Sequence, residues 1–480
     1  MGDTSKMAAN LTGLTMRFAR FAADLRYEDL PVEVVDKAKV IVRDSLGIQI
    51  AGSAASEPCR RMVELVKEWG GAGQATIVGH GIRVPAPQAA LCNAMMAHSL
   101  QRDDIHVGGM IKTGAVVVPT AFAAAELSGA AGKAFLAALV AGFEIAIRVS
   151  KSISPGARRR SFHASGTVGG LAAAATSAKL LGCDAEAIAW AMWLAGSQTA
   201  GLVAFLDDSS MVKPTLTGKA AFNGVQSGIM ASRGFTGPKV ILEGKEGFFN
   251  AFTDAVRVED LLNGFGERFV IMEVGLKPHA ACRHSHTAID LAQQLYHEDS
   301  VRLADVEEAT VSLCEISVRH TDIPECPTFD TAMGSTNFAV ALALAKGDNG
   351  LATCWEGFED AAIRAAAKRV RLCVESEFGA TGRAAIIEVR LKDGRSIRRR
   401  QDLPKGEPSV PLTEEELARK YLRLAGLVME ESQARKIEAV IMAIEDQPRA
   451  GIVPELTAPH ENVPALRAAR RELGDLAFAV

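Results

Sequence analysis

Residues 167–181 read Thr-Val-Gly-Gly-Leu-Ala-Ala-Ala-Ala-Thr-Ser-Ala-Lys-Leu-Leu, and they are apolar or small on nearly every side. A helix of this composition has no polar face to present to water, so we expect it to be buried among other helices. Gly169 and Gly170 would allow a neighbouring helix to approach closely. Gly182 follows Leu181, where a helix commonly ends. The stretch therefore predicts a multilayer helical domain.

Helical spacing of apolar residues recurs through the first half of the chain. Spacings of i, i+3 and i+4 predict further helices over residues 31–50, 87–100, 115–127, 133–150 and 185–200. Near the other end, Thr413-Glu-Glu-Glu416 has the residues of a capping box and predicts a return to helix. We expect a large all-helical domain over residues 8–268, completed by residues 408–450.

The pattern changes after about residue 265. The runs 384–391 and 396–400 have strand character and flank Asp393-Gly394, which predicts a β-hairpin. Helical patterns precede these runs. We therefore expect a smaller α+β lid domain over residues 269–405, followed by a C-terminal tail over 451–480. The predicted fold class is mainly α.

Composition narrows the class of protein. The chain has 480 residues, 48% of them hydrophobic, and a net charge of −4, which gives no reason to expect nucleic acid or a membrane as a partner. Its longest apolar stretches, such as residues 134–147, are too short and too polar to cross a bilayer. Eight scattered cysteines without a Cys-x-x-Cys pair indicate reduced thiols in a cytoplasmic protein.

Cationic and imidazole side chains gather in residues 275–290. Lys277, Arg283 and the histidines His279, His284 and His286 all fall in this stretch. Such groups can hold a small carboxylate and move a proton on it. Taken alone, the stretch is equally compatible with a basic surface loop. It lacks the second Cys or His pair that a zinc site needs, so we expect no metal.

Two further candidates stand directly before predicted helices. His163 precedes Gly166-Thr167, whose backbone N–H groups at a helix start would suit a carboxylate, and Lys213 precedes Pro214. The alternatives are an ordinary helix cap and a solvated lysine. Asp103-Asp104 could serve as acid or base, although we favour a capping role. The chain has no phosphate-binding or dinucleotide-binding glycine loop and no nucleophile elbow, which argues against ATP, NAD and acyl-serine chemistry.

Taken together, a series of segments resembles the MmgE/PrpD family, which includes 2-methylcitrate dehydratase, cis-aconitate decarboxylase and iminodisuccinate epimerase. Their joint order and spacing are specific. The matching segments are Arg43–Gly52, Asn93–Leu100, Gly114–Pro119, His163–Thr167, Lys179–Asp184, Lys213–Pro214, Gly234–Pro238, Leu242–Gly244 and Lys277–Asp290. The resemblance implies a helical domain with a lid domain, a homodimer and no cofactor. It also implies site roles for His163, Lys213 and Lys277.

The chain departs from the dehydratase and decarboxylase members at several positions. Gln101 stands where those members carry a site aspartate, and Ile111-Lys112 replaces a His-Pro pair. Cys282 stands where the decarboxylase carries a histidine, and Phe338 stands where a tyrosine is common. Gln and Ile cannot carry a proton. Epimerisation needs one acid–base pair and no leaving group, so these losses favour it.

We therefore expect proton transfer, without a cofactor, at the carbon α to a carboxylate of a small di- or tricarboxylate, in an enzyme of the epimerase type. The alternatives are a dehydratase or decarboxylase of a citrate-like acid, with Asp103 or His106 as the acid, and a carboxylate-binding protein without catalysis. The predicted catalytic residues are His163, Lys213, Cys282 and His286. The predicted substrate-binding residues are Gln101, Lys112, Lys277, Arg283 and His284.

Overall fold

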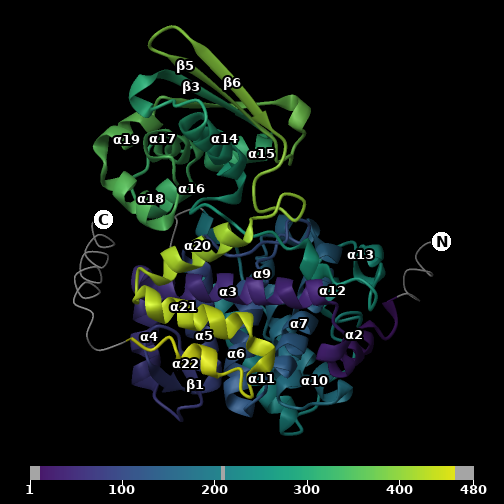
Figure 1. Cartoon of the computed structure of the whole chain (residues 1–480). Coiled ribbons are helices and arrows are strands. Elements are labelled where there is room, and N and C mark those ends of the chain that lie inside the picture. Colours follow the sequence, from purple (N-terminus) through teal and green to yellow (C-terminus); the bar gives the residue numbers. More distant parts are fainter. Residues whose placement is uncertain (1–10, 207–210, 460–480) are drawn as a thin grey trace, which may run out of the picture. The chain divides into compact units, whose positions relative to one another are not determined.

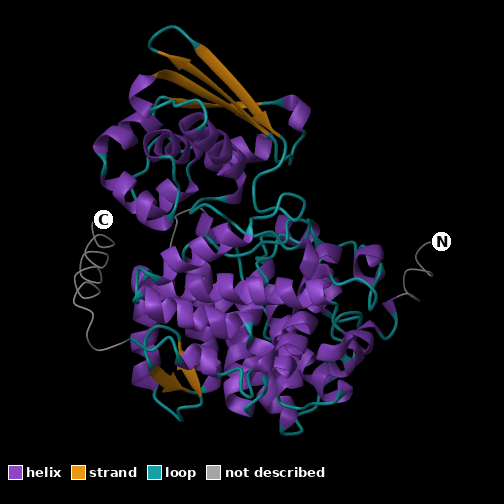
Figure 2. Ribbon diagram, in the orientation of Figure 1, coloured by secondary structure: helices purple, strands orange, loops and turns teal. Residues whose placement is uncertain are grey.

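The computed structural model describes residues 11–206 and 211–459. These residues form two compact units: residues 11–274 with 417–459, and residues 275–416. Helices dominate, and strands are confined to two small sheets (Figures 1 and 2). The prediction of a mainly α protein with a smaller α+β part is confirmed.

The first unit consists of helices and one short hairpin. Its strands β1 (Ala75–Ile77) and β2 (Ile82–Val84) pair antiparallel. Helix α20 (Glu414–Ala425) begins in the second unit, and its residues from Leu417 belong to the first. The other helices are α2 (Leu14–Asp24), α3 (Val32–Ala55), α4 (Glu57–Trp69), α5 (Ala86–Ser99), α6 (Gly114–Ser128), α7 (Gly132–Ile153), α8 (Gly156–Arg159), α9 (Ala164–Leu180), α10 (Ala185–Gly196), α11 (Lys213–Ser232), α12 (Phe248–Phe252), α13 (Val258–Leu262), α21 (Glu431–Met442) and α22 (Ile452–Glu455).

Helix α9, which contains all but the last residue of the apolar stretch 167–181, lies inside this bundle and packs against α6, α7, α10 and α11. Small residues set its approach to α11. A Cβ atom added at Gly224 of α11 would lie 2.2 Å from Cβ of Ala173, and one at Gly228 would lie 2.3 Å from Oγ of Ser177. The helices can therefore approach this closely only because those two positions lack side chains.

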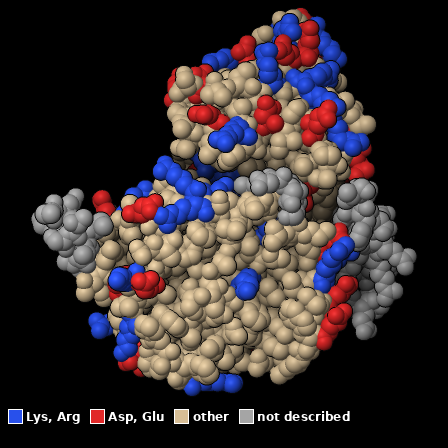
Figure 3. All heavy atoms as spheres, turned by 180° about the vertical axis from the view of Figure 1, so that it is seen from behind, with Lys and Arg blue, Asp and Glu red and all other residues tan. Residues whose placement is uncertain are grey.

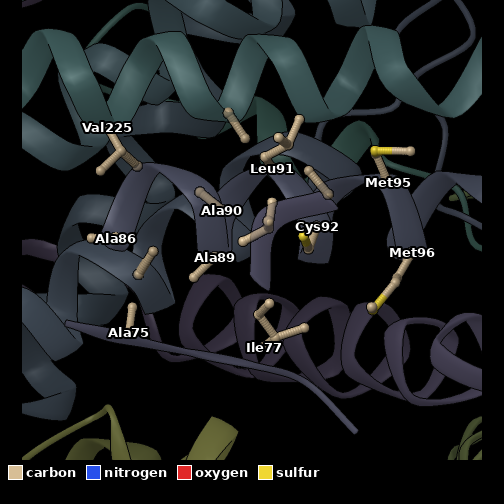
Figure 4. Close-up of a cluster of buried hydrophobic side chains, with 14 of the residues drawn as sticks. Ala75, Ile77, Ala86, Ala89, Ala90, Leu91, Cys92, Met95, Met96 and Val225 are labelled. Atoms are coloured by element: carbon tan, nitrogen blue, oxygen red, sulfur yellow. The ribbon is translucent and has the colours of Figure 1, made fainter. Parts of the chain in front are cut away.

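Helix α5 is buried on opposite sides. Leu91 and Met95 point toward α11, where Val225 lies, and Ile77 of β1 lies on the other side of the helix (Figure 4). Because the cluster includes Cys92 and several alanines, the surrounding helices pack close to the α5 backbone. This packing fixes the end of α5, from which the chain continues into the candidate site.

The second unit combines helices with a four-stranded sheet. The strands β3 (Val306–Leu313), β4 (Val370–Val374), β5 (Ala385–Leu391) and β6 (Ser396–Gln401) have the order β4-β3-β5-β6. β3 and β4 are parallel, whereas β3–β5 and β5–β6 are antiparallel. The helices are α14 (His286–His297), α15 (Glu315–Thr321), α16 (Phe329–Gly334), α17 (Thr336–Lys346), α18 (Leu351–Glu359) and α19 (Ala361–Ala367).

The hairpin predicted around Asp393-Gly394 is confirmed as β5–β6. Gly394 has φ of 89°, a left-handed conformation that glycine adopts without strain. Helix α14 packs against β5 and β6, and α17 packs against β4. The side chains of β5 alternate accordingly between buried and exposed toward its end.

The predicted C-terminal tail is described only up to residue 459, and residues 460–480 lie outside the described part of the chain. Its first residues form α22, in which Val453 is fully buried, and Thr457 Oγ1 accepts a hydrogen bond of 3.1 Å from the backbone N–H of Gly79. This start of the tail is therefore packed into the first unit. Within the described residues, no helix is both long and apolar enough to cross a membrane.

Candidate active site

The end of α5 carries His98, and the chain reverses directly after it. Helix α5 ends at Ser99, and Gln101 has φ of 53°, in the left-handed region. A left-handed residue after a helix turns the chain away from the helix axis. Asp103 then reaches back, and its Oδ2 lies 2.6 Å from Nδ1 of His98. Both side chains are buried.

Burial also sets the protonation of His98. Loss of hydration lowers its pKa to about 4, although the carboxylate of Asp103 acts in the opposite direction. The ring is therefore neutral at neutral pH. An ionised carboxylate only accepts hydrogen bonds, so the ring keeps its proton on Nδ1 and has a lone pair on Nε2. This buried Nε2 atom has no hydrogen-bond partner among residues 11–206 and 211–459.

The backbone of His163 is fixed at the start of α9. Its N–H donates to the carbonyl of Gly201 at 3.0 Å, and its own carbonyl accepts from the N–H groups of Gly166 and Thr167, each at 3.0 Å. The expectation that these two N–H groups would be exposed to a carboxylate is therefore wrong, because they close the first turn of the helix. They hold His163 instead.

The ring of His163 lies beside that of His98, with 5.5 Å between the ring centroids. Burial lowers the pKa of His163 well below its usual value, and the neighbouring His98 and the charges of Lys112 and Lys213 lower it further. Its Nδ1 is buried without a hydrogen-bond partner within the described part of the chain. Two neutral imidazoles thus each keep one nitrogen available to a ligand.

Two lysines approach this pair from neighbouring segments. The backbone N–H of Lys112 donates to Oγ of Ser165 at 3.0 Å, which joins the segment before α6 to the start of α9. Lys213 is the first residue of α11, with Pro214 in its first turn. Both positive charges lower the pKa of His98 and of His163. A site lined in this way attracts anions.

Asp104 lies buried at the N-terminus of α6. Its Oδ2 accepts a hydrogen bond of 3.0 Å from the N–H of Gly114, and a Cβ atom at Gly114 would lie 2.6 Å from the other carboxylate oxygen. Burial raises the pKa of Asp104 to about 7, while the bond to Gly114 opposes the rise. This carboxyl group can therefore hold or release a proton near neutral pH.

In the second unit, the guanidinium of Arg283 is held by several groups. Its Nε and Nη2 atoms lie 3.2 and 2.7 Å from Oε1 of Glu407, and Nη1 donates to the carbonyl of Lys405 at 3.0 Å. Nη1 also lies 3.0 Å from Nδ1 of His286, whose Nε2 lies 3.2 Å from the carbonyl of Ala281. Both nitrogens of His286 are thus engaged within the fold, and burial lowers its pKa well below the usual value.

The other predicted residues of this segment differ in exposure. Lys277 is buried, whereas Cys282 and His284 are half-buried. Nδ1 of His284 lies 3.0 Å from Oγ of Ser317. The segment therefore contains both anchored groups and partly accessible ones.

The first unit thus brings together His163, Lys213, Lys112 and the turn at Gln101. These residues lie in separate stretches of the sequence, so the sequence could only suggest that they meet. His98 is not among the site residues predicted from the sequence, although a histidine five residues before an aspartate at a helix end was the available signal. No cluster of three or more metal-binding side chains occurs within the described residues.

Known protein families account for nearly the whole chain. The MmgE/PrpD N-terminal domain matches residues 16–260, and the MmgE/PrpD C-terminal domain matches residues 279–446. The chain belongs to the MmgE/PrpD family. This confirms the resemblance seen in the sequence, and it makes the protein an enzyme of the MmgE/PrpD type.

Several named relatives of this MmgE/PrpD chain are decarboxylases. The cis-aconitate decarboxylase of Aspergillus terreus is 26% identical over 462 residues, covering 90% of this chain and 94% of that protein. Those of mouse and human are each 24% identical, covering 91% of this chain and 91% and 92% of the relatives. At this level of identity, the reaction of this member has to be argued from its own residues.

Proposed function

We propose that this MmgE/PrpD protein catalyses proton transfer at the carbon α to a carboxylate of a small di- or tricarboxylic acid. The observation that carries the proposal is the buried pair of neutral imidazoles, His98 and His163, whose ring centroids lie 5.5 Å apart. One nitrogen of each has no partner within the described part of the chain. The neutral ring of His98 can take a proton from a substrate carbon, while His163, once protonated beside an anionic substrate, can return one.

The proposed proton transfer uses side chains of the first unit. Nε2 of His98 takes the α-proton, and the electron pair of the broken C–H bond moves into the carboxylate as an enediolate. The positive charges of Lys112 and Lys213 stabilise this anion. Asp103 stabilises the imidazolium that His98 becomes. His163 enters this step protonated, a state that the negative charge of a bound substrate carboxylate favours. Its imidazolium returns a proton to the opposite side of the carbon, which gives the epimer and leaves His163 neutral, and exchange with water resets both rings.

In this proposal, the predicted residues of the second unit are divided by their contacts. Lys277 stays a predicted site residue by likeness to the family, and Cys282 stays one by its position, where the decarboxylase carries a histidine. Arg283 and His286 instead hold their own segment in place, because their polar atoms are bonded to Glu407, Lys405 and Ala281. His286 would have to break two contacts before it could exchange a proton with a substrate.

Loss of a group from the same intermediate is the second candidate, and it would make the protein a decarboxylase or dehydratase. The names of the relatives support it, and so does Asp104, whose pKa of about 7 leaves it partly protonated at neutral pH. His106 is less available to a substrate, because its Nδ1 accepts from the N–H of Gly109 and its Nε2 lies 3.0 Å from Glu273. Gln101 and Ile111 support epimerisation, which needs no leaving group.

The deciding experiment is proton NMR in heavy water with iminodisuccinate, 2-methylcitrate and cis-aconitate. Deuterium at the α-carbon with inverted configuration supports epimerisation. A new alkene or a decarboxylated product supports the second candidate and directs attention to Asp104. Absence of exchange with all three acids, or a His163→Ala variant with full turnover, would overturn the proposal.

A further inference from the structure

Three ion pairs connect α3 to the C-terminal part of the first unit. Lys39 pairs with Glu445 in a short 3₁₀ turn (Ile444–Asp446), and Nη1 of Arg43 lies 2.9 Å from Oε1 of Glu438 on α21. The third pair joins Oδ1 of Asp44 to Nζ of Lys420 on α20 at 2.5 Å. All three cations are at least nine-tenths buried.

The third pair differs from the other two, because Nζ of Lys420 also donates a hydrogen bond of 3.0 Å to the carbonyl of Arg102. The carbonyl of Arg102 and the N–H of Asp103 form one peptide group. The orientation of this peptide group therefore determines the position from which the Asp103 side chain extends. Gln101, which precedes Arg102, is in the left-handed backbone conformation, which is costly for a residue other than glycine.

A buried ion pair is weak support for a fold, because well-packed apolar residues commonly stabilise as much. Lys420 and Asp44 are each 5% exposed, so neither gains the solvation that a surface pair keeps. Stability therefore does not explain why this ion pair is present, whereas the contact of Lys420 with Arg102 does. Through this contact the pair is joined to the turn that brings Asp103 to His98.

We propose that Lys420, oriented by Asp44, is a positioning residue that holds the Arg102–Asp103 peptide so that Asp103 fixes the proton of His98 on Nδ1. The catalytic consequence rests on the proposed function, in which Nε2 of His98 is the base. The structural consequence, the state of the His98 ring, does not depend on any substrate.

The test compares double variants that remove a buried pair without leaving an unpaired charge. Asp44→Asn with Lys420→Met removes the donor to Arg102. The matched control is Lys39→Met with Glu445→Gln, which removes a pair from the same helix but does not contact the turn. Lys420→Arg keeps a cationic donor and should restore the wild-type behaviour. If the first double variant does not fold, Asp44→Asn with Lys420→Leu takes its place, because a leucine side chain has no donor either.

The first measurement is the histidine side-chain NMR spectrum of the full chain without substrate. The low-field Nδ1–H signal that disappears in His98→Gln reports the bond to Asp103. We expect it in the wild type, the control and Lys420→Arg, and we expect it to be shifted or lost in Asp44→Asn/Lys420→Met. A signal unchanged in that variant would overturn the proposal.

The second measurement is turnover on whichever acid the wild type converts. We expect kcat to fall about ten- to a hundred-fold in Asp44→Asn/Lys420→Met, since small misplacements of a catalytic group are costly. KM should stay within about two-fold, because the variant touches no substrate-binding group. A wild type without turnover would refute the proposed function alone, while the spectra would still decide the role of Lys420.

Discussion

Nδ1 of His98 lies 2.6 Å from Oδ2 of Asp103, and both side chains are buried. The contact joins a helix end to the turn that follows it, and it fixes the tautomer of a neutral imidazole. It also leaves the opposite ring nitrogen as the proton acceptor. A carboxylate that orients an imidazole in this way is a recurrent means of preparing a general base.

If this pair is the base, changing either partner should lower turnover strongly. His98→Gln removes the acceptor, and Asp103→Asn can donate to Nδ1, which moves the ring proton to Nε2. We expect kcat to fall by about 10²–10⁴ in both, the range for a lost acid–base catalyst. Steady-state kinetics on the substrate identified by NMR would check this. Wild-type kcat in Asp103→Asn would contradict the assignment, and far-UV circular dichroism would control for folding.

Charge at the start of α11 should affect binding of a carboxylate substrate. Lys213→Gln should lower kcat/KM about ten- to a hundred-fold, because a hydrogen bond to a charged group contributes about 1.5–3 kcal/mol. Lys219, which is exposed on the same helix, gives the matched control Lys219→Gln, and we expect this variant to behave like the wild type. Equal effects of the two substitutions would exclude a local role for Lys213.

Asp104 should make stability depend on pH. Its pKa is raised from 3.8 to about 7 in the folded state, so the folded protein keeps the proton over a range where the unfolded chain has lost it. The resulting stabilisation is present below about pH 4 and is lost as the pH rises through about 7. The difference corresponds to roughly 4 kcal/mol.

Asp104→Asn removes this titration. Urea unfolding at pH 5 and pH 8 should show that the variant loses less stability than the wild type over that interval, because its side chain never becomes charged. Identical losses in the two proteins would show that Asp104 does not titrate in this window.

Glu407 should be important for the second unit. Glu407→Ala leaves the buried guanidinium of Arg283 without its anion, so we expect a loss of about 3–5 kcal/mol in the free energy of unfolding. Glu377 pairs with Arg400 on the exposed surface, so Glu377→Ala should leave the free energy of unfolding nearly unchanged. Denaturant unfolding of both variants tests the contrast, and a similar cost for the two would refute it.

The homodimer implied by the family stays a prediction, and the surface of the first unit supports it. One face of this unit carries few charged side chains, as Figure 3 shows. Faces depleted of charge are typical of subunit contacts. Light scattering should give about twice the chain mass of 50.8 kDa. A mass equal to a single chain at micromolar concentration would contradict the prediction.

Local sequence predicted the elements well, where periodicity or turn chemistry is decisive. The apolar stretch 167–181 became the buried helix α9, and Asp393-Gly394 became the turn of β5–β6. Both depend on interactions within a few residues of one another. The prediction that the N–H groups of Gly166 and Thr167 are exposed to a carboxylate was wrong, because the sequence does not show that they donate to the carbonyl of His163.

By itself, the sequence determined the mainly α class, the close helix packing through small residues, and the family, because these depend on the order and spacing of residues along the chain. Only the tertiary structure decided that His98 pairs with Asp103, that His163 lies beside it, and that Lys420 holds the intervening turn. The physical reason is that protonation and tautomer depend on burial and on neighbouring charges, which are contributed by segments far apart in the chain.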